Sequence, residues 1–316
     1  MSAMVASPDM EHKSGREAGR EIESGIGTEA VSGDGRTRII AVIGPTASGK
    51  SARAVELALE RGGEVISMDS RQVYRTLDLG TEKTALQEMR GIPHHLIDIR
   101  EPEETYSAGD FADDAAQLIE TLSTGGKMPI LAGGTHFYLD ALLYGLPEKA
   151  PPNPLLRAQL ESRSAEELFA ELQMKDPRRA QEIDPKNARR LVRALELVEQ
   201  FGSVPERRGS RKETLLSPAR YDVEWVIIDP PADVLRARID TRLRDALDRG
   251  LIEEVRRVRD RVGDTRLNEF GLEYRIIGEF LRDERDEDSL FPALSRKLWQ
   301  YARHQKAWLR KLSAAA

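Results

Sequence analysis

The chain of 316 residues is 40% hydrophobic and 32% charged, a balance that supports a packed core beneath a charged surface. It has no cysteine, which excludes disulfides, thiolate catalysis and cysteine-ligated zinc. No apolar run approaches the roughly 20 residues of a membrane helix, and residues 1–35 lack the apolar core of a signal peptide, so the sequence predicts a cytoplasmic protein with no membrane partner.

The formal net charge of -6 argues against a nucleic-acid partner, but the charge is unevenly distributed. Residues 296–311 contain six Lys or Arg and no acid, and Trp299, Tyr301 and Trp308 lie between them without sharing one helical face. Residues 186–212 contain eight basic residues and three acidic ones. These two patches keep an RNA partner open, although a solvated basic face gives the same pattern.

Residues 1–36 are rich in Gly, Ser and charged residues and contain no aromatic residue. Such a segment cannot bury enough apolar surface to offset the entropy lost on ordering. The composition therefore predicts a disordered tail.

Strand and helix patterns alternate in the part of the chain that follows. Short β-branched or apolar runs are separated by segments with apolar residues at helical spacing. The expected strands are residues 37–43, 64–70, 94–99 and 128–134, and the expected helices are 50–62, 107–126 and 135–145. This order predicts an α/β fold with a P-loop NTPase-like, mainly parallel sheet flanked by helices, and ligands at the carboxyl ends of the strands.

The alternation stops at residues 146–156, where four prolines interrupt regular structure. Helical patterns follow at 154–176 and 185–202 with no strand pattern between them. We therefore expect an all-helical insertion over residues 147–219.

Strand character resumes at residues 222–230, and one long amphipathic helix is expected from about Ala232 to Val262. Two further helices around the charged turn at 282–288 end the chain. The P-loop core domain is accordingly assigned to residues 37–146 and 220–316.

A phosphate-binding loop is encoded in GPTASGKS, residues 44–51, between a β-branched strand and a helix. Glycines let the backbone fold around an anion, and the N-terminus of the helix favours negative charge. Lys50 supplies a positive charge and the Ser51 hydroxyl is placed to bind Mg²⁺. A glycine-rich turn without a ligand is the alternative. The residues expected to contact the bound phosphate are Gly44, Thr46, Ala47, Ser48, Gly49, Lys50 and Ser51.

The loop alone does not specify the reaction, because ATPases, small-molecule kinases and transferases that expel diphosphate all use it. Asp69 ends the neighbouring strand pattern, where a carboxylate can act as a metal ligand or a general base. A helix N-cap or a turn is the alternative role.

Six sequence blocks stand in a fixed order and resemble the tRNA dimethylallyltransferase family, also called tRNA isopentenyltransferases. The resemblance runs from about residue 38 to about residue 311. The blocks are GPTASGKS at 44–51, MDSRQVYRTLDLGTEK at 68–83, GIPHHLIDIREPEETYSAGDF at 91–111, ILAGGTHFYLDALLYGL at 130–146, RRLVRALEL at 189–197 and YARHQKAWLR at 301–310.

The resemblance implies transfer of a dimethylallyl group from dimethylallyl diphosphate to N6 of an adenine beside the anticodon of tRNA. Lys50 and a Mg²⁺ ion on Ser51 would then stabilise charge on the leaving diphosphate. Asp69 would act as the general base, and Thr135 would orient the amine or cap the helix that follows it. Arg238 and Arg242 match a basic pair that would clamp the diphosphate, with an exposed charged helix face as the alternative.

The target base must leave the stack of the anticodon stem-loop to reach such a site, so phosphate contacts must hold the tRNA. We expect the enzyme to be a monomer. The resemblance assigns the tRNA contacts to Asp69, Ser70, Arg71, Gln72, Thr135, Arg157, Arg189, Arg190 and Arg193.

Three residues depart from the family pattern: His136 stands where Gly is usual, and Glu273 and Ile276 flank Tyr274 and Arg275 in place of Gly and a polar residue. The same residues are compatible with two other functions. One is a P-loop kinase of a small metabolite, which leaves the basic patches without a role. The other is a non-catalytic RNA-binding adaptor.

Overall fold

A six-stranded sheet lies at the centre of the computed structural model, which describes residues 20–23, 33, 35–146, 153–205 and 220–313. The strand order is β1-β6-β2-β5-β3-β4, and all neighbouring strands are parallel except β1 and β6. The strands are β1 Arg20–Glu23, β2 Thr37–Ile43, β3 Gly63–Ser67, β4 His94–His95, β5 Met128–Gly133 and β6 Tyr221–Asp229. The predicted mainly parallel sheet is confirmed.

The predicted disorder of residues 1–36 is wrong for residues 20–23, which form β1 at the edge of the sheet. The strand pairs antiparallel to β6, with Arg20 opposite Asp229. Strand pairing uses backbone groups, so a segment with few apolar side chains can still add to a sheet edge. Residues 1–19, 24–32 and 34 lie outside the described residues.

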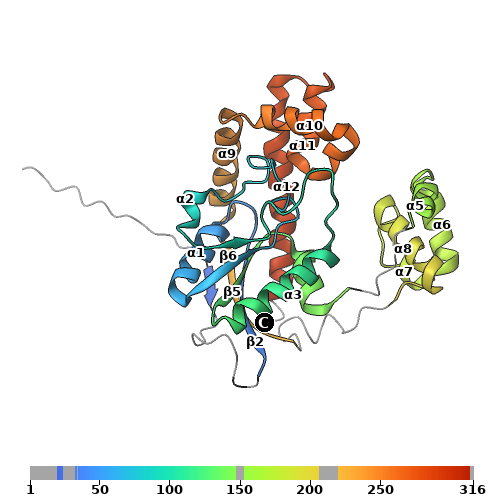
Figure 1. Cartoon of the computed structure of the whole chain (residues 1–316). Helices are drawn as coiled ribbons and strands as arrows, with labels where there is room; N and C mark the ends of the chain where they lie inside the picture. The colour runs from blue at the N-terminus through green and yellow to red at the C-terminus, as the bar shows by residue number, and fades with distance from the viewer. Residues whose placement is uncertain (1–19, 24–32, 34, 147–152, 206–219, 314–316) are drawn as a thin grey trace, which may run out of the picture.

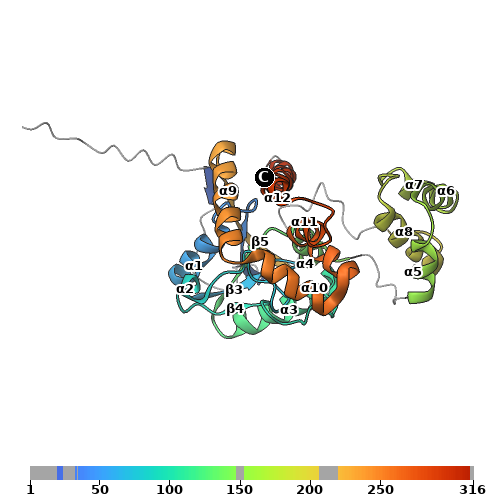
Figure 2. The same cartoon turned by 90° about the horizontal axis from the view of Figure 1, so that it is seen from above.

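Both faces of the sheet are covered by helices, as Figures 1 and 2 show. Alternate residues of β2 serve the two faces, because Ile39 and Ile43 join one hydrophobic core and Ile40 and Val42 join the other. The second core includes α1, and the first includes α3, α4 and the C-terminal helices. The helices of this part are α1 Lys50–Arg61, α2 Leu86–Met89, α3 Ala108–Thr124 and α4 His136–Tyr144.

Helix α3 begins where the sequence predicted. Ser107 Oγ accepts a hydrogen bond from Asp110 N at 3.2 Å, and Asp110 Oδ2 accepts one from Ser107 N at 2.8 Å, which is a reciprocal capping box. The strand expected at 94–99 is wrong beyond His95, because Leu96 and Asp98 have left-handed backbone angles that end the extended chain.

The segment from 153 to 205 is helical throughout its regular elements, as expected for the insertion. It encloses a hydrophobic core of its own, in which Leu168, Leu172 and Leu191 are fully buried. Figures 1 and 2 show this helical unit beside the α/β body rather than on the sheet. Its helices are α5 Pro154–Glu161, α6 Ala165–Lys175, α7 Pro177–Ala180 and α8 Ala188–Phe201.

The single helix expected from Ala232 to Val262 is wrong, because two helices occupy this range. Gly250 adopts a left-handed φ of 96° between them, a conformation that only glycine reaches without strain. The amphipathic pattern continues across the break and therefore gave no sign of it. The last helices are α9 Ala232–Asp248, α10 Leu251–Leu267, the 3₁₀ turn η1 Asn268–Phe270, α11 Leu272–Leu281 and α12 Glu287–Ser313.

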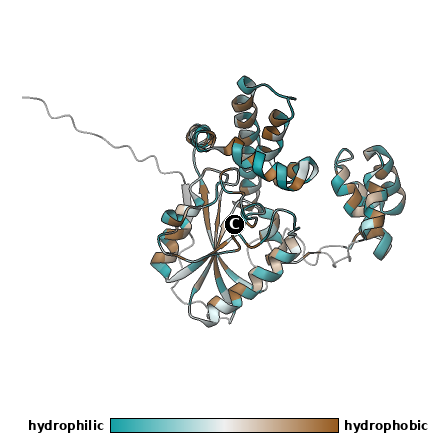
Figure 3. Cartoon of the chain, turned by 45° about the horizontal axis from the view of Figure 1, so that its top comes forward, coloured by the Kyte–Doolittle hydropathy of each residue, from teal (hydrophilic) through white to brown (hydrophobic). Residues whose placement is uncertain are grey.

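Figure 3 shows that hydrophobic residues are concentrated in the strands, whereas the helices carry both hydrophobic and hydrophilic residues. Among the helices that the structure describes, none is both long enough and apolar enough to cross a membrane.

Candidate active site

The phosphate-binding loop follows β2 and leads into α1, as its sequence predicted. A Cβ atom on Gly44 would lie 2.6 Å from both Ile228 O and Ser48 Oγ, so only glycine fits there. Ala47 and Gly49 have left-handed φ angles of 60° and 100°, which curl the backbone between the strand and the helix. The local geometry is that of an anion-binding loop.

Lys50 begins α1 and turns its side chain back over the loop, where Nζ donates to Pro45 O at 2.8 Å. Burial lowers the pKa of Lys50 to about 8; the carboxylates of Glu82 and Asp69 raise it in part, and Arg242 lowers it. Ser51, in the first turn of the helix, lines a cavity next to the loop. The lysine is thus held beside the loop, and no carboxylate in the described part of the chain bonds directly to it.

Thr46 is tied to two distant parts of the chain. Its backbone N–H donates to Gln305 Oε1 at 2.9 Å, and its hydroxyl donates to Glu82 Oε2 at 3.1 Å. Arg242 from α9 forms an ion pair with the same Glu82 carboxylate, and Arg238 donates to Ser48 O at 3.2 Å. The basic pair therefore contacts the loop and Glu82, while Arg238 stays exposed and the Arg242 side chain is 41% exposed.

Asp69 follows β3, and Thr135 follows the adjacent strand β5. Asp69 Oδ1 accepts from the backbone N–H groups of Arg71 and Gln72, at 2.9 and 3.4 Å. Thr135 Oγ1 accepts from Ser70 N at 3.2 Å and makes no side-chain cap to α4, so the helix-cap alternative is wrong for its hydroxyl. Hydrogen bonds hold both side chains at the carboxyl ends of adjacent strands.

Glycines allow the loops after β3 and β5 to touch. A Cβ on Gly133 would lie 2.0 Å from Met68 O, so any side chain would force β3 and β5 apart. Gln305 of α12, only 4% exposed, donates through Nε2 to Gly134 O at 3.2 Å. Because the other end of its amide holds Thr46, Gln305 fixes the phosphate loop and the Gly-Gly-Thr loop to each other. The sequence block YARHQKAWLR contained it, but its partners are 171 and 259 residues away.

Arg71 was expected to contact tRNA, but its guanidinium lies in the cavity wall. Nη1 donates to Glu273 Oε2 at 2.8 Å, and the Glu273 side chain is 8% exposed. Burial alone would lower the pKa of Arg71, yet Glu273 and Asp69 raise it above its ordinary value. Burial raises the pKa of Glu273, and Arg71 opposes that effect. The departure at Glu273 therefore supplies the partner of Arg71.

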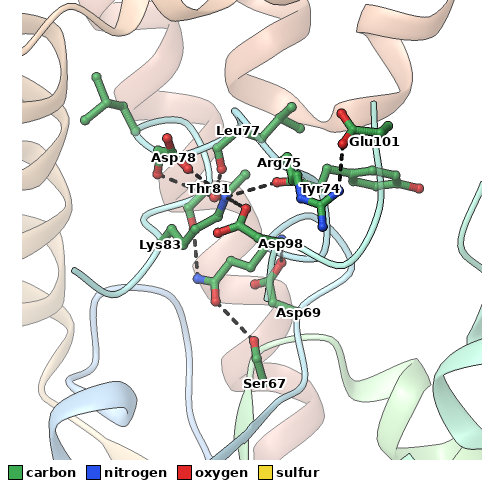
Figure 4. Close-up of polar contacts among 12 residues, drawn as sticks. Ser67, Asp69, Tyr74, Arg75, Leu77, Asp78, Thr81, Lys83, Asp98 and Glu101 are labelled. Atoms are coloured by element: carbon green, nitrogen blue, oxygen red, sulfur yellow. Dashed lines mark hydrogen bonds and ion pairs between the residues drawn. The ribbon is translucent and has the colours of Figure 1, made fainter. Parts of the chain in front are cut away.

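Figure 4 shows how hydrogen bonds hold the loop that follows Asp69. Lys83 Nζ donates to Asp78 Oδ1 and to Asp98 Oδ1, both at 2.6 Å, and to Tyr74 O at 3.0 Å. Lys83 therefore ties the two ends of the loop to each other and to Asp98.

Gln72, another expected tRNA contact, also uses its side chain inside the protein. Its Oε1 accepts from the Ser67 hydroxyl at 3.1 Å, and its Nε2 donates to the carbonyls of Thr81 and Glu82 at 3.1 and 3.2 Å. Gln72 thereby orders the loop at both ends.

Glu254 supports this loop from α10. Its carboxylate accepts from the backbone N–H groups of Asp78, Leu79 and Gly80 at 3.1, 2.8 and 3.0 Å, and from the Tyr274 hydroxyl at 2.7 Å. A Cβ on Gly80 would lie 2.7 Å from the Tyr274 ring. Tyr274 is thus a core residue that holds the loop indirectly.

We expect Glu254→Ala to destabilise the protein by about 3 kcal/mol, because three backbone N–H groups and a buried hydroxyl lose their acceptor. Glu253→Ala, on the exposed neighbouring residue, is the control and should change stability by less than about 0.5 kcal/mol. Urea unfolding followed by circular dichroism measures both. Equal stability of the two variants would show that the carboxylate does not hold the loop.

One cavity of about 450 Å³ brings these groups together. Its wall contains residues of the phosphate loop, of the segment after β3, and of α9, α11 and α12. Its lining includes Thr46, Ala47, Gly49, Lys50, Ser51, Asp69, Arg71, Gln72, Gly80, Thr81, Glu82, Gly134, Arg242, Glu273 and Gln305.

Oxygen ligands for a hard cation are present in this cavity. Ser51 supplies a hydroxyl, and Asp69 and Glu82 supply carboxylates, the types of group that Mg²⁺ prefers. In the described part of the chain no three His, Cys, Asp or Glu residues are arranged to hold a metal by themselves. The residues fit a Mg²⁺ ion that shares its coordination with substrate phosphates.

The expected tRNA-binding arginines of the helical unit differ in their surroundings. Arg157 donates to both oxygens of Glu196 at 2.8 and 2.9 Å, and Arg193 donates to the same carboxylate at 3.0 Å. Arg189, 84% exposed, lies 3.9 Å from Glu269 of the α/β body. Arg190 is exposed and forms no ion pair with any residue that the structure describes. Arg190 is the member whose charge is least compensated.

His136 fills space between α4 and α12. Its ring stacks on Trp308 with centroids 3.9 Å apart and an angle of 9° between the planes. Burial, and then Lys50, lower the pKa of His136 to about 4, so the ring is neutral at pH 7. Of the aromatic residues of the basic C-terminal patch, Tyr301 lines the cavity, while Trp299 and Trp308 pack against the main core.

The sequence matches known proteins over most of its length. Residues 72–312 match the family model described as IPP transferase. A tRNA dimethylallyltransferase of Thermomicrobium roseum is 44% identical over 284 residues, covering 88% of this chain and 84% of that protein. One from Anaeromyxobacter dehalogenans is 39% identical, covering 87% of this chain and 92% of that protein.

The fold is also similar to solved structures of tRNA-modifying transferases. The tRNA isopentenylpyrophosphate transferase of Bacillus halodurans superposes with a TM-score of 0.64 at 34% identity, covering 86% of both chains. A eukaryotic dimethylallyltransferase acting on tRNA gives a TM-score of 0.71 at 28% identity, covering 86% of this chain and 69% of that one. These matches confirm the resemblance seen in the sequence. The chain, with its phosphate loop and Asp69 around one cavity, belongs to the IPP transferase family.

Proposed function

We propose that the protein transfers the dimethylallyl group of dimethylallyl diphosphate to N6 of an adenine beside the anticodon of tRNA and releases diphosphate. The observation that carries this proposal is the meeting of an anion-binding loop and Asp69 in one cavity. A donor and an acceptor can thus be held together, which is what a group transfer requires.

On the donor side, the allylic C–O bond breaks while negative charge grows on the diphosphate. Lys50, Arg242 and the N-terminus of α1 lie at the loop where that charge would develop. A Mg²⁺ ion on Ser51 would supply further charge stabilisation when bound with the donor. The apolar side chains of Val55 and Leu298 line the same cavity and suit a hydrocarbon group.

On the acceptor side, the exocyclic amine must lose a proton as it bonds to carbon. Asp69 Oδ1 is engaged by two backbone N–H groups, while Oδ2 has no hydrogen-bond partner among the described residues. Oδ2 is therefore available to accept the proton as a general base. Thr135 Oγ1, which already accepts from Ser70 N, has a second lone pair for an amine N–H.

Binding of the anticodon stem-loop is assigned to the helical unit, with the target base extruded into the cavity. Arg190 is the clearest phosphate contact, because its charge is exposed and uncompensated within the described chain. Arg157 and Arg193 share the single carboxylate of Glu196, which leaves one net positive charge in that cluster. The enzyme is proposed to be a cytoplasmic monomer.

We expect Arg190→Ala to weaken tRNA binding and to make the dependence of log K on log salt shallower by about one unit, the value for one lost phosphate contact. Arg163→Ala is the matched control in the same helical unit, because Glu171 already compensates that arginine. Filter binding at several salt concentrations measures both slopes. An unchanged slope for Arg190→Ala would remove this residue from the tRNA interface.

Nucleoside analysis of tRNA tests the function in cells. Cells without the gene should lack prenylated adenosine, and the gene should restore it. An unchanged nucleoside profile would contradict the proposed function.

A further inference from the structure

Glu82 places a carboxylate inside the cavity that we assign to the donor diphosphate. Its Oε2 accepts from the Thr46 hydroxyl at 3.1 Å and forms an ion pair with Arg242. Both partners belong to the set expected to hold the donor. Glu82 thus binds two groups that an anionic ligand would need.

The backbone fixes Glu82 in this place. Its φ of 54° is in the left-handed region, which a residue other than glycine adopts only when the surroundings hold it. The side chain of Gln72 does so by donating to Glu82 O at 3.2 Å and to Thr81 O at 3.1 Å. The carboxylate is therefore a built part of the site.

The charge balance of the cavity makes the Glu82 carboxylate important for anion binding, because acidic side chains outnumber basic ones in the cavity wall. Arg71 is already paired with Glu273, which leaves fewer cations for a diphosphate. Five acidic side chains line the cavity, Glu56, Asp69, Glu82, Glu88 and Glu273, against four basic ones, Lys50, Arg71, Arg90 and Arg242. A bare diphosphate would meet net negative charge.

We propose that Glu82 is a specificity residue of the donor site, one that makes it select the Mg²⁺ complex of a diphosphate over the bare anion. This inference rests on the proposed function. A bare diphosphate must displace Glu82 from Arg242 and Thr46. A complex that carries a divalent cation reduces the repulsion and presents a positive charge to the carboxylate.

Titration calorimetry with inorganic diphosphate, with and without Mg²⁺, tests this role. Without Mg²⁺, Glu82→Gln should bind diphosphate at least about tenfold more tightly than the wild type, a difference of about 1.4 kcal/mol. With saturating Mg²⁺ the gain should vanish or reverse. Glu82→Gly, which also relieves the left-handed backbone, should change the Mg²⁺-free affinity in the same direction.

Glu60→Gln is the matched control, because Glu60 lies on helix α1 and pairs with Arg53 but does not line the cavity. It should alter the Mg²⁺-free affinity by less than about threefold, as expected for an exposed charge. If both Glu82 variants bind Mg²⁺-free diphosphate no more tightly than the wild type, the role of Glu82 is wrong while the donor site stands. If the wild type binds no diphosphate under either condition, the donor site and the role of Glu82 both fail.

Discussion

Asp69→Asn is expected to lower kcat by about 10³-fold, while the dissociation constants for tRNA and for the donor change by less than about threefold. Asparagine keeps the oxygen that accepts from the N–H groups of Arg71 and Gln72, so the loop after β3 should keep its shape. What it loses is the carboxylate that we propose takes the proton from the amine. The loss therefore falls on the chemical step, and single-turnover kinetics measures it.

Asp98→Asn is the matched control for this prediction. Asp98 lies on a neighbouring loop, pairs with Lys83 and does not line the cavity (Figure 4). Its kcat should stay within about threefold of the wild-type value, as for an exposed surface charge. Full single-turnover activity in Asp69→Asn would contradict the general-base role of Asp69.

Lys50→Met is expected to lower kcat/KM by about 10²- to 10³-fold, because the growing charge on the diphosphate loses its nearest cation. The pKa of Lys50 of about 8 adds a second signature. Below pH 8 the lysine is charged and the wild type should bind a non-reactive donor analogue at constant affinity. As the pH rises above 8 the lysine loses its proton and the affinity should fall.

In Lys50→Met the fall in affinity above pH 8 should be absent, because no group titrates at that position. Lys83→Met is a useful comparison, since Lys83 bonds to Asp78 and Asp98 outside the cavity wall. Its affinity should still fall above pH 8. A wild-type affinity that stays flat to pH 10 would show that Lys50 does not contact the bound phosphates.

Local sequence was sufficient for the features that depend on neighbouring residues. The phosphate loop, the start of α3 at Ser107 and the positions of Asp69 and Thr135 just after β3 and β5 follow from short patterns, because the residues that define them are close in the chain. The order of strands and helices then indicated that these strand ends share one edge of the sheet.

The residues that complete the cavity or support its loops could not be found in this way. Gln305 binds partners that lie 171 and 259 residues away in the chain. The backbone groups that Glu254 binds lie 174 to 176 residues away, and the Arg71 partner of Glu273 lies 202 residues away. No periodicity or spacing reports such contacts, although the departure of Glu273 from the family pattern marked one of them. Two further errors came from backbone features that pattern reading does not detect, namely the break at Gly250 and the edge strand β1.

The most direct measurement incubates the purified protein with dimethylallyl diphosphate, Mg²⁺ and unmodified tRNA, and then analyses the tRNA nucleosides by mass spectrometry. A parallel reaction contains ATP in place of the prenyl donor. The account predicts prenylated adenosine and an equal amount of released diphosphate in the first reaction, and no phosphate transfer in the second. Phosphate transfer from ATP without any prenylated adenosine would contradict it.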